Sequence, residues 1–215
     1  MRIAAISDQH GLLPDIPPSD LLLIGGDICP VSNHGEAFQG EWLDTEFRCW
    51  LSRVPARKIV GVAGNHDFVF QRQPRLVPRD LPWTYLEDSG CEWEGLRFWG
   101  TPWQPWFFDW AFNLHEPDLV PVWARIPEGT DILVLHGPPH GYGDAVPRAG
   151  GVELTGSPSL TERIRQIAPR LAIFGHIHEG RGEWRLGPTT LANVTLVDVK
   201  YQPVFPVWTH DLEGS

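Results

Sequence analysis

Short apolar runs, most of which end in glycine or histidine, limit the fold of this chain more than any other feature. Their length is typical of buried β-strands and too short for a buried helix. Glycine at the end of a run allows the backbone to turn sharply. The runs are RIAAIS (2–7), DLLLIGG (20–26), KIVGVAG (58–64), DILVLHG (131–137) and RLAIFGH (170–176). We expect each of them to form a buried strand.

Two segments have the pattern of helices. Residues 36–54 place large apolar side chains on one helical face, and Pro55 follows as a stop signal. Residues 159–168 begin with Ser and Glu at the spacing of a capping box, which predicts Ser159 as the N-cap of a helix.

The remaining segments differ in pattern. Residues 68–90 contain three prolines and are predicted to be irregular, whereas 91–100 reads as a hairpin that turns at Glu94–Gly95. The segments 189–199 and 203–212 are predicted to form antiparallel strands that close a sheet. An early βαβ pattern followed by β-rich meanders indicates an α/β or α+β sandwich with two sheets.

Composition sets further limits. The chain has 215 residues and no segment with the composition of a linker, so residues 1–215 are predicted to form a single domain. The formal charge of −10 disfavours nucleic-acid polymers and anionic membranes as partners. Three widely spaced cysteines do not make a disulfide framework, and the start MRIAAISD lacks a signal peptide. We therefore expect a cytoplasmic protein with no membrane association.

Side chains that can bind metal ions follow each of the five predicted strands. They are Asp8 and His10, then Asp27, then Asn65 with His66 and Asp67, then His136, and finally His176 with His178. Ligands bind beyond the carboxyl ends of strands in open α/β sheets, so these groups are expected to converge. In the last pair, extended backbone would place both imidazoles on one face, because residues i and i+2 point the same way.

Each of these residues alone has an ordinary alternative. Asp8 could cap a turn, Asn65 is a common turn residue, and His136 could be a loop histidine. Together, mixed oxygen and imidazole ligands suit Mn, Fe, Zn, Ni or Co better than Ca, and the absence of cysteine ligands argues against a structural zinc site. There are too many ligands for one tetrahedral ion, and their number suits two divalent ions that share a carboxylate.

Five short motifs between residues 8 and 178 resemble the motif blocks of the calcineurin-like metallophosphoesterase superfamily. They are D-x-H, G-D, G-N-H-D, H-G and G-H-x-H. Further stretches are similar to the small MPPED-type phosphodiesterases within it, among them 100–114, 135–144 and 201–206. The resemblance implies a four-layer α/β/β/α sandwich of two mixed sheets, with a two-metal centre at the strand ends.

The resemblance also implies roles for individual residues. Asp8, His10 and His178 would hold the first ion, Asp27 would bridge both ions, and Asn65, His136 and His176 would hold the second. Asn65 and His66 would contact the substrate, with His66 beside the leaving group. Mn²⁺ is the expected ion, with Fe, Zn, Ni or Co as alternatives.

The implied reaction is in-line attack on phosphorus by a hydroxide that bridges the ions, with His66 as general acid. The expected substrates are small phosphodiesters, cyclic nucleotides among them. The related protein phosphatases carry phosphate-clamping arginines in two of these motif blocks. This chain has none in the corresponding segments GDICPVS (26–32) and AGNHD (63–67). The alternatives are a phosphomonoesterase or pyrophosphatase of the same superfamily, or a non-catalytic metal-binding regulatory module. The residue that orients His66 is left open, because Asp67 could point away.

A tryptophan-rich stretch, 93–113, and His140 are open to several interpretations. The stretch could be a hydrophobic plug, a surface that stacks a nucleobase, or a contact in a homodimer. His140 could be an additional substrate contact or an ordinary loop histidine.

Overall fold

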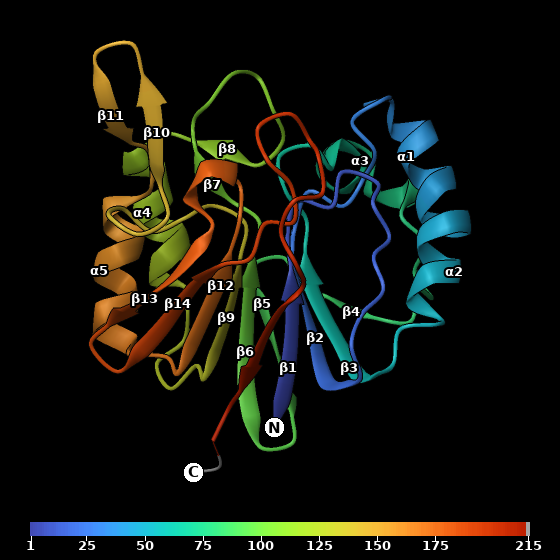
Figure 1. Ribbon diagram of the computed structural model, residues 1–215, viewed down its shortest axis with the longest axis horizontal. Helices are drawn as coiled ribbons and strands as arrows, with labels where there is room; N and C mark the ends of the chain where they lie inside the picture. Colours follow the sequence, from blue (N-terminus) through green and yellow to red (C-terminus); the bar gives the residue numbers. More distant parts are fainter. Residues whose placement is uncertain (214–215) are drawn as a thin grey trace.

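The computed structural model describes residues 1–213 and contains two large β-sheets between outer helices (Figure 1). The first sheet has the strand order β15-β1-β2-β3-β4, and only β15 is antiparallel to its neighbour. Its strands are β1 (Arg2–Ile6), β2 (Ser19–Gly25), β3 (Ala56–Val62), β4 (Thr84–Tyr85) and β15 (Trp208–Asp211).

The second sheet has the order β13-β14-β12-β9-β6-β5, with a parallel centre and an antiparallel strand at each edge. Its strands are β5 (Ser89–Trp93), β6 (Leu96–Thr101), β9 (Ile132–Leu135), β12 (Leu171–Phe174), β13 (Gly182–Leu186) and β14 (Thr189–Asn193). Two small strand pairs stand apart from both sheets: β7 (Gln104–Pro105) with β8 (Asn113–Leu114), and β10 (Ala145–Arg148) with β11 (Gly151–Leu154).

Helices cover the outer faces of both sheets. Beside the first sheet, α1 (Glu36–Trp42), the π-helical segment η1 (Leu43–Phe47) and α2 (Arg48–Leu51) follow one another without a break (Figure 1). The second sheet is covered by α4 (Glu116–Ala124) and α5 (Pro158–Ile167) (Figure 1). Shorter helices are α3 (Phe68–Arg72) and the 3₁₀ turns η2 (Pro74–Leu76) and η3 (His178–Gly180).

Alternation along the strands builds the layers. In β1, Ala4 and Ile6 pack with the cluster under α1 and α2, whereas Ile3 and Ala5 join a second cluster with Ile173 from the other sheet. A third cluster lies between the second sheet and the helices α4 and α5. Successive strand residues point to opposite faces, so each central strand contributes to two clusters. The predicted four-layer α/β/β/α sandwich of two mixed sheets is confirmed.

The five buried strands and the hairpin occur where the sequence predicts them, whereas other elements differ. Residues 68–90 are not wholly irregular, because they include α3, η2 and β4. The segment 189–199 forms a strand only as far as Asn193: β14 pairs antiparallel with β13, as predicted, but parallel with β12, and residues 194–199 leave the sheet. β15 does close the first sheet in antiparallel pairing with β1.

The predicted N-cap of the second helix is wrong by two residues. The cap is Ser157, whose side chain accepts a hydrogen bond from the Leu160 N–H, and Pro158 occupies the first turn. Proline is well suited to that position because it has no N–H to satisfy. Ser159 instead donates its hydroxyl to Glu116 of α4, 2.6 Å away.

No helix in the described part of the chain combines the length and the apolar composition needed to cross a membrane. The prediction of a single domain over 1–215 stays a prediction, and its last two residues lie outside the described ones.

Replacing Ser157 by alanine should lower the free energy of unfolding by about 2 kcal/mol. The change removes the acceptor for the Leu160 N–H and for the buried Trp123 Nε1–H, which lies 3.0 Å from the Ser157 hydroxyl. Ser159→Ala is the matched control and should cost about 1 kcal/mol or less, since the Ser159 backbone N–H still holds Glu116. Urea unfolding measures both, and a larger loss for Ser159→Ala would contradict the assignment.

Candidate metal centre

Loops at the carboxyl ends of the parallel strands are hydrogen-bonded to one another. The His10 N–H donates to the Asp27 carbonyl at 2.8 Å, which joins the loops after β1 and β2. The Gly175 N–H donates to the His136 carbonyl at 3.0 Å, which joins the loops after β12 and β9. The His176 N–H donates to the Asp8 carboxylate at 3.0 Å and so connects the two sheets. The predicted site residues therefore meet at one edge of the sandwich.

Four of these residues have left-handed backbone conformations. The φ angles are 55° at Asp8, 45° at His10, 52° at Asp27 and 66° at His176. A residue with a Cβ pays roughly 1–2 kcal/mol for such a conformation, and it persists only where the surroundings fix it. At these four residues the strained backbone turns the side chains toward the site.

The H-x-H pair reaches the site by a different route from the predicted one. β12 ends at Phe174, His176 turns into the left-handed region, and His178 begins the 3₁₀ turn η3. The backbone is therefore not extended through the pair. The two imidazoles face different neighbours: His176 faces Asn65, and His178 faces Asp8.

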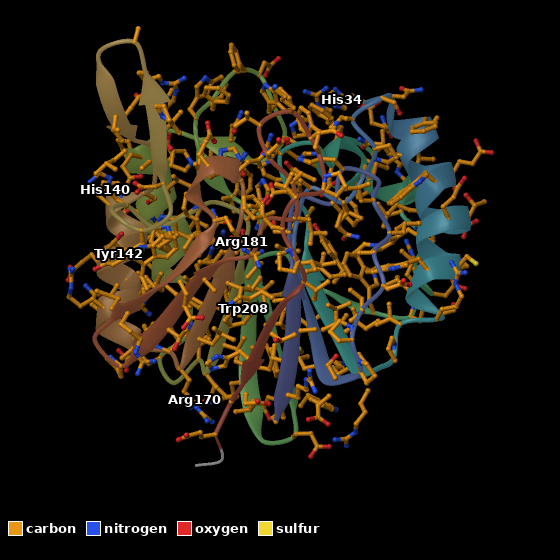
Figure 2. The ribbon with its side chains drawn as sticks, in the orientation of Figure 1. His34, His140, Tyr142, Arg170, Arg181 and Trp208 are labelled. Atoms are coloured by element: carbon orange, nitrogen blue, oxygen red, sulfur yellow. The ribbon has the colours of Figure 1, made fainter. Side chains whose placement is uncertain are left out.

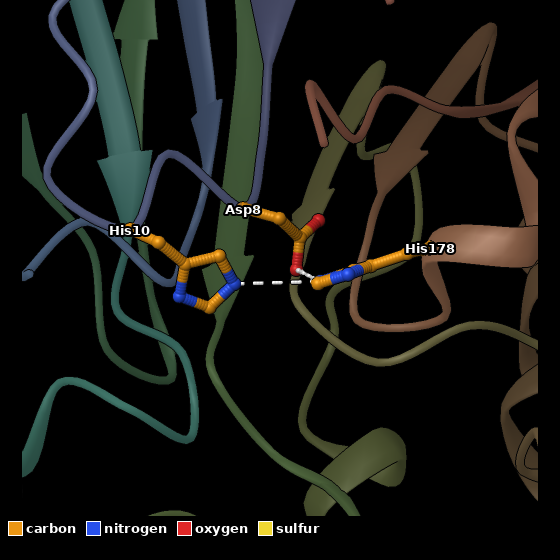
Figure 3. Close-up of side chains that lie close together, drawn as sticks. All are labelled: Asp8, His10 and His178. Atoms are coloured by element: carbon orange, nitrogen blue, oxygen red, sulfur yellow. Dashed lines mark hydrogen bonds and ion pairs between the residues drawn. The ribbon is translucent and has the colours of Figure 1, made fainter. Parts of the chain in front are cut away.

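The first cluster consists of Asp8, His10 and His178 (Figure 3). The Nε2 atoms of His10 and His178 lie 3.3 Å apart, and the His178 Nε2 is 3.4 Å from Asp8 Oδ1. The other ring nitrogen of His178 faces the Asp198 carbonyl at 3.0 Å, so a proton held there would leave Nε2 available to a metal ion. All three side chains are buried or nearly so. Two inward imidazole nitrogens and a carboxylate are a suitable donor set for a divalent ion.

The second cluster consists of Asn65, His136 and His176. The Asn65 Oδ1 is 2.8 Å from His136 Nε2 and 2.7 Å from His176 Nδ1. The remaining nitrogen of His136 faces the Gly25 carbonyl at 2.8 Å, which again leaves Nε2 free to coordinate. This set is chemically similar to the first, with an amide oxygen in place of the carboxylate.

Asp27 lies between the two clusters. Its Oδ2 is 3.7 Å from His10 Nε2, and its Oδ1 is 3.6 Å from His136 Nε2. Each carboxylate oxygen thus faces one cluster, which is the arrangement that a bridging ligand requires. Together the clusters fit a dinuclear metal site.

Burial dominates the electrostatics of the site. It lowers the pKa of both His10 and His176 to about 3 and lowers the pKa of His136 as well. These imidazoles are therefore neutral near pH 7, the form that coordinates metal ions. Burial, reinforced by Asp67 and Asp8, raises the pKa of Asp27 well above its usual value. For Asp8, burial alone would raise the pKa, but the hydrogen bond from His178 and the charges of the nearby histidines outweigh it and the pKa falls.

His66 lies beside the two clusters, with its Nε2 3.9 Å from Asp27 Oδ2. Asp67 does point away from it, as the sequence allowed, and accepts backbone N–H groups instead. The nearest partner of the His66 Nδ1 is His34 Nε2, at 3.2 Å. The ring of Trp110 lies 3.8 Å away, centroid to centroid. His34 belongs to none of the motif blocks, so no pattern in the sequence marks it as a site residue.

A cavity of about 490 Å³ opens above the site. The tryptophan-rich stretch divides: Phe112 lies in the core, whereas Trp106, Phe107 and Trp110 line the cavity. Tyr201 completes this wall, with its ring 4.7 Å from that of His10. Part of the stretch is therefore the predicted hydrophobic plug, and part of it faces the site.

One element that the sequence did not predict also shapes the surroundings of the site. The hairpin β10–β11 contributes Val146, Arg148 and Glu153 to the cavity lining. His140 lies 3.5 Å from Asp144 in the loop before this hairpin, and it is not part of the described cavity lining (Figure 2). This position favours an ordinary loop histidine.

The metal-free protein should lose stability as the pH falls from 7 to 5. Four buried histidines have lowered pKa values, so the unfolded chain binds protons below about pH 6.5 that the folded chain does not. Raised pKa values at Asp27, Asp67 and His178 act in the opposite sense but involve fewer groups. Each net proton changes the free energy of unfolding by about 1.4 kcal/mol per pH unit.

Urea unfolding in the presence of a chelator checks this prediction. We expect a lower midpoint at pH 5 than at pH 7. An equal or higher midpoint at pH 5 would contradict the prediction that the lowered pKa values of the buried histidines dominate.

Known proteins match this chain over most of its length. The family model described as calcineurin-like phosphoesterase matches residues 1–180. Metallophosphoesterase domain-containing protein 1 of Homo sapiens is 36% identical over 98% of this chain and 71% of its own length. UPF0046 protein T07D4.2 of Caenorhabditis elegans is 31% identical over 98% of this chain and 61% of its own length.

Solved structures agree with the fold. One crystal structure has a TM-score of 0.67 at 20% identity and covers 89% of both chains. That of TT1561 of Thermus thermophilus has a TM-score of 0.53 at 15% identity, with 89% of this chain and 88% of the other covered. The matched sequence, the shared sandwich and the Asp/His clusters at its strand ends agree with one another, and the chain belongs to the calcineurin-like phosphoesterase family.

Proposed function

We propose that this metal-dependent phosphoesterase hydrolyses small phosphodiesters, cyclic nucleotides among them. The observation that carries the proposal is the pair of ligand clusters joined by Asp27 at the floor of a cavity with few cationic groups. Asp8, His10 and His178 would hold one ion, and Asn65, His136 and His176 would hold the other. Mn²⁺ is the proposed ion, with Fe, Zn, Ni or Co as alternatives.

Divalent ions bound there would lower the pKa of a water nucleophile and neutralise the oxygens of the phosphate. The chain itself supplies the acid. His66 Nε2 faces the side of Asp27 that also faces His10, so it is directed toward the space where the reacting phosphate would lie. From there it can donate a proton to the leaving alkoxide. Asn65 and His66 would also contact the substrate.

The charge of the cavity favours a diester over a monoester or pyrophosphate. A phosphate monoester carries nearly two negative charges at pH 7, and its recognition usually requires arginine or lysine. Among the described residues of the lining, Arg148 is the one such residue, and it is paired with Glu153 at 2.8 Å. A diester carries one negative charge and needs less compensation.

The walls of the cavity favour a small substrate. Aromatic residues of the segment 105–110 and the hairpin β10–β11 both contribute to it. Aromatic side chains there could stack a planar group such as a nucleobase. The net charge of −10 opposes binding of a nucleic-acid polymer or an anionic membrane.

We further propose a cytoplasmic location, for which the free thiols of Cys29, Cys49 and Cys91 are the support. A homodimer through the aromatic segment stays a prediction.

Hydrolysis of bis-p-nitrophenyl phosphate beside p-nitrophenyl phosphate tests the function. Chelator-treated protein with Mn²⁺ added back should turn over the diester faster than the monoester. Asp27→Asn should lower kcat by at least about 100-fold, because it weakens the carboxylate that joins the two clusters. Asp131→Asn is the control: this carboxylate accepts the Arg97 N–H between β6 and β9, away from the site, and should leave kcat unchanged.

The other outcomes separate the alternatives. A clear preference for the monoester would identify a phosphomonoesterase or pyrophosphatase. Metal binding without turnover of either ester would contradict the proposed enzyme and favour a regulatory module.

A further inference from the structure

The two ring nitrogens of His66 face in opposite directions. Nε2 lies 3.9 Å from Asp27 Oδ2 on the side of the metal centre, and Nδ1 lies 3.2 Å from His34 Nε2 on the other side. His66 is 6% exposed, so its Nδ1 has little access to water, whereas His34 is exposed. A buried ring nitrogen that carries a proton needs an acceptor, and His34 is the side chain placed to provide it.

The backbone of His66 is already fixed by other groups. Its N–H donates to Asp27 Oδ1 at 2.7 Å, and its carbonyl accepts from the buried Gln39 Nε2 of α1, also at 2.7 Å. The freedom that remains is rotation of the imidazole. Trp110 limits that rotation on one face, and the hydrogen bond to His34 selects one orientation of the two nitrogens.

His34 is itself held in place. It lies in the loop just before α1, at the same end of the molecule as α3 (Figure 2). Its ring packs against Phe68 at 5.2 Å and against Trp110 at 5.7 Å, centroid to centroid. The adjacent Gly35 N–H donates to Asn33 Oδ1 at 2.9 Å, which tightens the loop. An exposed histidine packed on two aromatic rings is a defined contact partner.

We propose that His34 is a positioning residue for His66, an inference that rests on the proposed function. His66, neutral in the free protein, takes up a second proton from solvent when the anionic substrate binds; as the bond from phosphorus to the leaving oxygen breaks, it transfers its Nε2 proton to that oxygen and becomes neutral again. The proton that remains on His66 is at Nδ1 and is donated to the His34 Nε2 lone pair. His34 thereby keeps Nε2 aimed at the leaving group and fixes the tautomer of His66, much as a carboxylate does in other acid–base pairs.

The test compares diesters that differ only in the leaving group. With a p-nitrophenolate leaving group the acid is hardly needed, whereas phenolate and alkoxide groups require protonation. His34→Leu should lower kcat by at least about 10-fold for the poor leaving groups and by less than about 3-fold for p-nitrophenolate. His34→Gln places an amide near the position of Nε2 and should restore most of the loss. His210→Leu, on β15 and stacked on Trp208, is the control and should change neither.

A second comparison uses the double variant. If His34 acts through His66, His34→Leu should cause no further loss of kcat in a His66→Ala background. Metal content per chain should be the same in His34→Leu and in the unmodified protein. An equal loss with every leaving group, an additive double variant, or a loss of bound metal would overturn the positioning role.

A measurement without turnover separates this inference from the proposed function. In ¹⁵N NMR spectra of the metal-free protein, the Nδ1 and Nε2 shifts of His66 should indicate one tautomer, and His34→Leu should change their ratio. If no diester is hydrolysed but the shifts respond in this way, the proposed function fails and the contact stands. Unchanged shifts would overturn the contact itself.

Discussion

The carboxylate of Asp67 holds together the loops on which the whole site depends. It is fully buried and accepts N–H groups from Ile28 and Cys29, after β2, and from Gly64, after β3, at 2.8–3.1 Å. Hydrogen bonds to a carboxylate are stronger than those between neutral groups, and burial protects them from competition by water. The two loops that carry Asp27 and the G-N-H-D segment are thus tied to one anion, which fixes their separation.

Close approach of backbone to carboxylate is the second constraint. A Cβ on Gly64 would overlap the Asp27 Oδ1, and a Cβ on Gly175 would overlap the Asp8 Oδ2. The absence of side chains lets the loops after β3 and β12 close over these acids. Together with the left-handed conformations at the ligand residues, this packing determines where each donor atom lies before any ion binds.

The sequence predicts the central strands and the convergence of the residues that follow them, because both depend on strong local patterns. Buried apolar runs form strands, and groups after parallel strands converge at one edge. Other features have no such pattern. The helix α4 contains Pro121 and lacks a clear amphipathic face, and the β10–β11 hairpin is largely exposed. The partner of His66 is set by the tertiary contact of His34, which no spacing along the chain reveals.

A spectroscopic measurement tests the dinuclear centre most directly. Protein loaded with Mn²⁺ should give an electron paramagnetic resonance spectrum of two exchange-coupled ions, because Asp27 faces both clusters with one oxygen each. Two ions bridged in this way lie about 3.5–4 Å apart, which is close enough for coupling. A spectrum of isolated Mn²⁺ ions, or binding of a single ion per chain, would contradict the account.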